Sequence, residues 1–338
     1  MHIGRRVLRC LALAGLLLAG LAAGVPAPAV AADVVQYNMA WLPQGSQAGI
    51  FVAMEKGYYA AESLEVKPVR GYGGIRTTNE IDQGLFEFGY APPLGIILNR
   101  SKGGKTRLVG SINDKYPAGL CFVKERHTVR QPADLKGLTA GGGQGSPVQA
   151  MLPIWLKNNG LNPTDVKLMQ LDPAVIGPSL IQGKIDLAEC WLGSDRPVME
   201  SMARKANVTV DWVEYRRYGM DIYGNGVATS EKILKERPDL VRRFVRATYR
   251  GYEQANRNPE EATDALLKHF PTLDRAVTLQ QTRETADLMT GPHTPERGLG
   301  WVDGKKMERT RDFLAAAYNV TGAIAVDDLY TNEFLPKR

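Results

Sequence analysis

The residue types that support catalysis or metal binding are sparse and scattered in this sequence. After the first 32 residues the histidines are His127, His269 and His293, and none has a cysteine or second histidine nearby at metal-ligand spacing. The chain contains neither the G-x-S-x-G turn of many hydrolases nor the G-x-x-x-x-G-K-[ST] phosphate loop. We therefore expect no catalytic residues, no metal ion and no other cofactor.

A glycine-rich segment is the clearest local feature that could hold a ligand. It runs from Gly141 to Ser146 and fails the dinucleotide-binding pattern, because Ser146 stands where the third glycine would be. It follows an expected strand and precedes an expected helix, so Gly145 and Ser146 would present N–H groups at a helix N-terminus, which favours an anion or a polar acceptor. A plain tight turn with Ser146 as the helix cap explains the same residues equally well.

Aromatic and amide residues recur just after the expected strands. Open α/β sheets bind ligands at the carboxyl ends of their strands, so such residues are candidates for a shared site. Each one alone is more often a packing residue, but together they fall on one expected edge. The candidates are Trp41, Gln44, Tyr72, Pro92, Pro93, Asn113 and Trp191.

Strand and helix patterns alternate through the first two thirds of the chain, which predicts an α/β protein with mostly parallel sheets flanked by helices. Strands are expected at 34–41, 64–69, 86–90, 107–111, 119–124, 138–140, 166–171, 185–191 and 224–230, and a helix at 48–62. A chain of this length favours two lobes. We expect one lobe from 33–118 with 224–338 and the other from 119–223, with a ligand cleft between them.

The first 32 residues have the order of a secretory signal peptide. Arg5, Arg6 and Arg9 precede an apolar run at 11–23, and the small residues 30–32 follow. We expect cleavage after Ala32 and a periplasmic location. Loss of three arginines lowers the formal net charge from +6 to +3, and no basic stripe suggests nucleic acid.

Two cysteines, Cys121 and Cys190, remain after the expected leader. An exported protein can form a disulfide. We expect two buried free thiols, with a Cys121–Cys190 bridge as the alternative.

Several runs of residues resemble the ABC-importer substrate-binding proteins of the nitrate, sulfonate, taurine and thiamine-pyrimidine-precursor type. They are WLP at 41–43, QAGIFVA at 47–53, KGYY at 56–59, SLIQGKIDLA at 179–188 and LYTNEFL at 329–335. The resemblance covers nearly the whole chain after the leader. It implies a two-lobed periplasmic-binding-protein fold of type II. Carried over by position, it implies ligand contacts from Trp41, Gln44, Gly145, Ser146, Glu189 and Trp191, with Tyr72 and Asn113 as further candidates.

The resemblance implies a protein that captures a small molecule and delivers it to the permease of an ABC importer. Yeast relatives that make the thiamine pyrimidine are enzymes with a cysteine-rich iron-binding stretch, which this sequence lacks. A synthase-like enzyme and a sensing lobe for a membrane receptor are the alternatives. The aromatic residues and Glu189 favour an aromatic or pyrimidine-like solute, whereas a capped helix end favours a sulfonate or carboxylate. We expect a monomer, since no coiled-coil pattern or long apolar edge strand is present.

Overall fold

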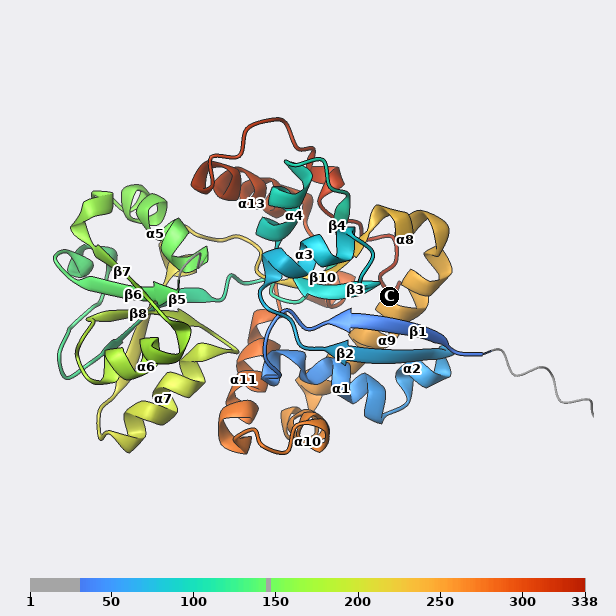
Figure 1. Cartoon of the computed structure of the whole chain (residues 1–338), viewed down its shortest axis with the longest axis horizontal. Helices are drawn as coiled ribbons and strands as arrows, with labels where there is room; N and C mark the ends of the chain where they lie inside the picture. Colours follow the sequence, from blue (N-terminus) through green and yellow to red (C-terminus); the bar gives the residue numbers. More distant parts are fainter. Residues whose placement is uncertain (1–30, 144–146, 338) are drawn as a thin grey trace, which may run out of the picture. The chain divides into compact units, whose positions relative to one another are not determined.

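The computed structural model describes residues 31–143 and 147–337. Ten strands in these residues form two five-stranded sheets (Figure 1). The first sheet has the order β2-β1-β3-β10-β4 and the second the order β7-β6-β8-β5-β9. The first comprises β1 Asp33–Asn38, β2 Leu64–Val69, β3 Phe88–Ala91, β4 Thr106–Ser111 and β10 Gly226–Ser230. The second comprises β5 Ala118–Val123, β6 Thr139–Gly143, β7 Lys167–Leu171, β8 Leu187–Trp191 and β9 Val210–Glu214. The parts built on these sheets are called lobe 1 and lobe 2 below.

Each sheet is mixed, with one strand that opposes its two neighbours. β10 runs antiparallel to β3 and β4, and β5 runs antiparallel to β8 and β9, while the remaining pairs are parallel. In both sheets the opposing strand is the one on which the chain arrives from the other sheet. The expected mostly parallel sheets are thus interrupted at the two crossings. The expected residue limits of the lobes stay a prediction.

Helices flank both sheets (Figure 1). Those of lobe 1 are α1 Ala48–Glu55, α2 Tyr58–Ala61, α3 Gly74–Asp82, α4 Pro93–Arg100, α8 Glu231–Glu236, α9 Pro238–Arg257, α10 Pro259–His269, α11 Arg275–Leu288, α12 Thr294–Arg297 and α13 Gly304–Ala317. Those of lobe 2 are α5 Pro147–Asn158, α6 Pro173–Ile181 and α7 Asp195–Lys205. Within the described residues, no helix is both long and apolar enough to span a bilayer.

The core of lobe 1 forms around α9, whose apolar residues recur at helical spacing. Leu240, Phe244 and Tyr249 are buried, and the Phe244 ring stacks on Phe88 of β3 at a centroid distance of 4.0 Å. Burial of one such side chain contributes about 2 kcal/mol. This packing anchors the sheet whose strand ends carry the candidate residues.

The expected single helix at 48–62 is wrong, because it is divided into α1 and α2. Gly57 adopts a left-handed conformation with φ of 68° and separates the two helices. Glycine reaches this conformation without steric cost, so it ends the first helix. The apolar residues keep helical spacing on both sides of Gly57, so the pattern gives no sign of the turn.

The expected pair of free thiols is also wrong, because Cys121 and Cys190 form a disulfide. Cys121 lies in β5 opposite Ala188, and Cys190 lies in β8 opposite Gly119, so the two cysteines are diagonal neighbours on one face. Their Cα atoms are 5.5 Å apart, within the range that a disulfide requires. Both side chains are buried beneath α6 and α7.

Candidate functional site

A cavity of about 830 Å³ is lined by residues at the strand ends of both sheets. This volume lies within the range of about 300–1,000 Å³ found for small-molecule sites. Its lining includes Trp41 after β1, Tyr72 after β2, Pro92 after β3, Asn113 after β4, Gly143 at the end of β6 and Trp191 at the end of β8. The strand-end argument therefore selects residues that share one cavity.

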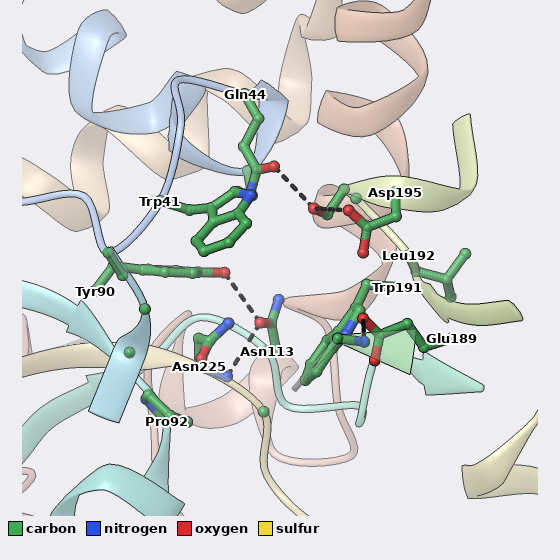
Figure 2. Close-up of a pocket in the computed structure, with 18 of the residues that line it drawn as sticks. Trp41, Gln44, Tyr90, Pro92, Asn113, Glu189, Trp191, Leu192, Asp195 and Asn225 are labelled. Atoms are coloured by element: carbon green, nitrogen blue, oxygen red, sulfur yellow. Dashed lines mark hydrogen bonds between the residues drawn. The ribbon is translucent and has the colours of Figure 1, made fainter. Parts of the chain in front are cut away.

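Trp41 reaches this cavity through a constrained turn at the end of β1 (Figure 2). Ala40 has a φ of 62°, which costs a non-glycine residue about 1 kcal/mol. Two hydrogen bonds hold this turn: Ala40 N donates to Asn38 Oδ1 at 2.8 Å, and Gly73 N donates to the Ala40 carbonyl at 2.6 Å. The Trp41 side chain remains 42% exposed, so its indole face is available to a solute.

Strand β8 presents Trp191 and Glu189 from lobe 2. Successive side chains on a strand point to opposite faces, so these two lie together while Cys190 faces the buried side. Glu189 Oε1 accepts a hydrogen bond from Gly143 N at 2.9 Å. The Trp191 ring meets Tyr116 edge-on at 5.8 Å, which fixes its plane.

Asn113 presents hydrogen-bond donors to the cavity. Its Oδ1 accepts from the Tyr90 hydroxyl at 3.0 Å and from Asn225 N at 3.1 Å. Because a backbone N–H can only donate, Oδ1 must be the acceptor, and this settles the orientation of the amide. The Asn113 nitrogen consequently points away from these partners and into the cavity (Figure 2).

A polar contact joins the two lobes at the cavity. The Ser194 hydroxyl, in the turn after β8, donates to Gln44 Oε1 at 2.8 Å (Figure 2). Gln281 of α11 reinforces this contact, because its Nε2 donates to the Ser194 carbonyl at 2.9 Å and its Oε1 accepts from Gly45 N at 3.0 Å. Gln44 thus holds the lobes together rather than only facing a solute.

Asp195 begins α7 beside this contact. Burial and the nearby negative charge of Glu189 raise the pKa of Asp195 to about 7, against a weaker lowering by the Ser194 hydroxyl. The group therefore exchanges between donor and acceptor forms near neutral pH. Within the described residues, the charged side chains that line the cavity are Arg76, Glu189 and Asp195.

Tyr72 lies at the rim of the cavity. It is 59% exposed, with the guanidinium groups of Arg70 and Arg76 at 4.8 and 5.0 Å from its ring centroid. Gly145 and Ser146 lie outside the described residues. Among the residues that the structure describes, no three His, Cys, Asp or Glu side chains are grouped so as to hold a metal ion.

The family model described as NMT1/THI5 like matches residues 44–262, which is more than half of the chain. The chain belongs to the NMT1/THI5-like family. The match spans most cavity-lining segments of both lobes and ends within α10.

Known proteins are similar to this chain over most of its length in sequence or in structure. The riboflavin-binding protein RibY of Chloroflexus aurantiacus is 27% identical over 92% of this chain and 89% of its own length. The formylaminopyrimidine-binding protein of Halalkalibacterium halodurans is 26% identical over 95% of this chain and 97% of its own. The crystal structure of the periplasmic aliphatic sulphonate binding protein SsuA from Escherichia coli has a TM-score of 0.68 at 15% identity, covering 88% of this chain and 91% of that one. The expected two-lobed periplasmic-binding-protein fold is confirmed.

Sequence reasoning missed several cavity residues of this NMT1/THI5-like protein. Tyr90 is the penultimate residue of β3 and could have been found by the strand-end argument that selected Pro92. Ser194 and Asp195 carry a readable signal, because a serine directly before a helix and an acid in its first turn mark the helix start. Asn225 precedes β10, and no local pattern assigns it to a site.

Proposed function

We propose that this protein captures a planar heteroaromatic solute outside the cytoplasmic membrane and presents it to the permease of an ABC importer. One observation carries the proposal: Trp41 from lobe 1 and Trp191 from lobe 2 line the same cavity. Indole rings from two separate lobes can both pack against a flat ring that lies between them. Because both lobes contact such a ring, its binding favours the closed arrangement of the lobes.

The polar groups around the two indoles match the edge of a nitrogen heterocycle. Asn113 offers N–H donors, and the Glu189 carboxylate accepts N–H donors. An aminopyrimidine or a pyrimidinedione carries both kinds of group on one edge. The names of RibY and of the formylaminopyrimidine-binding protein point to the same chemical class.

Electrostatics disfavour the sulfonate or carboxylate alternative at the centre of the cavity. Glu189 and Asp195 both line it, and the described cationic side chain of the lining, Arg76, is 61% exposed at the rim. An anion near two carboxyl groups would meet repulsion, or would require their protonation. A neutral or weakly basic ring avoids this cost.

Localisation and partners follow from the same proposal. Residues 1–32 act as a secretory leader, and the processed protein works in the periplasm as a monomer. Light scattering of protein that lacks residues 1–32 should give the mass of one chain at micromolar concentration. A stable dimer would contradict this part.

A thermal-shift panel tests the proposed function. Riboflavin, formylaminopyrimidine, an alkanesulfonate and an aromatic acid are each added at the same concentration. A ligand that binds the native state at one hundred times its Kd stabilises it by about 2.7 kcal/mol. We expect the melting temperature to rise with the heterocycles and to stay constant with the sulfonate. The reverse pattern would overturn the heteroaromatic assignment.

The synthase-like alternative is tested with the same samples. Capture leaves the solute chemically unchanged, so chromatography after denaturation should return it intact and in stoichiometric amount. Conversion of the solute would support the enzyme. A sensing role differs from import only in the membrane partner, so solute uptake by vesicles that contain an ABC permease and its ATPase separates these two.

A further inference from the structure

The cavity extends from the two indoles into an apolar groove between α6 and α7. We define this α6/α7 groove by the cavity-lining residues Ala174, Ile176, Gly177, Pro178, Leu192, Val198, Met199 and Met202. None of these side chains can form a strong hydrogen bond. The groove is therefore chemically distinct from the polar part of the cavity around Asn113 and Glu189.

Helix α7 forms one wall of the groove. Asp195, Val198, Met199 and Met202 recur at helical spacing and line the cavity together, with the carboxyl group at the end nearest the polar part. Val198 and Met202 are 38% and 36% exposed, although a valine and a methionine gain from burial. Methionine side chains adapt to irregular apolar surfaces, which suits a wall that receives a ligand.

Helix α6 forms the opposite wall with small or compact residues. Ala174, Gly177 and Pro178 line the groove at the same spacing. A Cβ atom placed on Gly177 would lie 3.1 Å from Met202 Sδ and 3.7 Å from Met199 Cγ. Gly177 thus packs directly against the methionine wall, and its missing side chain lets α6 and α7 approach closely at the base of the groove.

The α6/α7 groove is continuous with the rest of the cavity, and part of its apolar lining is exposed. The group that fills the groove therefore belongs to the same solute. A volume of about 830 Å³ suits a drug-sized ligand, and a single ring held by Trp41 and Trp191 would leave the α6/α7 side uncovered. An apolar group of the solute that covers this exposed apolar surface would strengthen binding.

We propose that the solute is a fused heteroaromatic whose apolar edge lies in the α6/α7 groove while its polar edge meets Asn113 and Glu189. This inference rests on the proposed function and narrows its substrate class. It predicts that, of two ligands with the same polar edge, the one with an additional apolar ring binds more tightly.

Lumazine and lumichrome form a matched pair of probes, because both carry a pyrimidinedione edge and only lumichrome carries a dimethylbenzene ring. Isothermal titration calorimetry on the full protein measures both. We expect lumichrome to bind at least about tenfold more tightly than lumazine, equivalent to about 1.4 kcal/mol. Ala174 is exposed and lines the groove from α6, so Ala174→Leu should fill the groove and remove this advantage, while lumazine affinity stays within about twofold.

Val175→Leu is the matched control. Val175 is exposed on the same helix and outside the cavity lining, so this variant adds bulk to α6 without entering the groove. Its affinities should equal those of the wild type. Equal binding of both probes to the wild type, or equal losses for both in Ala174→Leu, would overturn the groove assignment and leave the heteroaromatic site standing. Binding of neither probe would overturn the heteroaromatic assignment and the groove with it.

Discussion

Burial and the nearby charge of Glu189 raise the pKa of Asp195 to about 7, and this shift has a consequence for stability. The unfolded chain ionises this group near pH 4. Between pH 4 and 7 the folded state therefore holds a proton that the unfolded state has released. Stability must fall as the pH rises through this window, and the penalty is complete above pH 7.

Replacement of Asp195 by asparagine should remove this pH dependence. The asparagine side chain would keep the shape of the neutral acid, so Asp195→Asn should melt at a higher temperature than the wild type at pH 8 and at nearly the same temperature at pH 4.5. Thermal melting at the two pH values measures this. Asp312→Asn on the exposed side of α13 is the control and should follow the wild type. An identical pH profile in Asp195→Asn would refute the assignment.

Trp191→Ala should weaken solute binding far more than it lowers stability. Loss of an aromatic contact in a desolvated pocket costs about 2 kcal/mol, roughly thirtyfold in affinity. Trp155 of α5 is the matched control, because it is fully buried and its Nε1 donates to the Tyr215 carbonyl at 3.1 Å. Trp155→Phe should lower the melting temperature and leave the affinity of folded protein unchanged. The opposite pattern would show that Trp191 serves packing.

At the residue scale, the position of a side chain can be predicted from the sequence where a strand end alone determines it, whereas its contact with a solute stays a prediction. Trp41, Asn113 and Trp191 line the cavity for this reason. Gln44 also lines it, but its bond to Ser194 depends on how the lobes meet, which no local pattern encodes. The orientation of the Asn113 amide likewise depends on Asn225, more than one hundred positions away in the sequence.

At the scale of elements, the disulfide joins the entry strand of lobe 2 to the strand that carries Glu189 and Trp191. It closes a sequence separation of 69 residues, for which chain entropy gives a stabilisation of about 4 kcal/mol. The cysteines face the buried side of β8, away from the cavity residues. The bridge should therefore support stability more than recognition.

Reduction should lower the melting temperature of the wild type, and the double variant Cys121→Ala with Cys190→Ala should melt at that lower temperature with or without reductant. Solute affinity of the folded double variant should remain within about threefold of the wild type, an effect smaller than about 1 kcal/mol. A melting temperature of the wild type that does not respond to a strong reductant would argue against a stabilising bridge.

The type of an element can be predicted from the sequence where the hydrophobic period is long, as in α9. Prediction is poorer where a single residue decides where an element ends. Gly57 divides the expected 48–62 helix although the apolar spacing continues. The antiparallel course of β5 and β10 follows from the crossings between the sheets, and a strand pattern carries no direction. Among the described residues, the periods therefore predicted every strand except β9, but not the mixed arrangement of the strands.

At the scale of the whole molecule, two sets of contacts join the lobes: one at the crossing segments, and one beside the cavity, where α11 also binds the turn after β8 and the start of α7. Lys306 of α13 lies 3.4 Å from Asp114, which follows β4, and 2.8 Å from Asp221, which precedes β10, so it holds both crossing segments. The bond from Ser194 to Gln44 lies across the cavity from these crossings. The first set fixes the pivot, whereas the second forms only when the lobes meet.

Ser194→Ala should therefore favour the open arrangement, because it removes the hydroxyl that donates to Gln44. A neutral hydrogen bond contributes about 0.5–1.5 kcal/mol, so solute affinity should fall about two- to tenfold. Small-angle X-ray scattering should show a larger radius of gyration for the variant than for the wild type without solute, and equal radii at saturation. Ser201→Ala on the same helix is the control, because Ser201 does not line the cavity. A variant with normal radius but weakened binding would instead mean that Ser194 contacts the solute directly, since closure and recognition would then have separated.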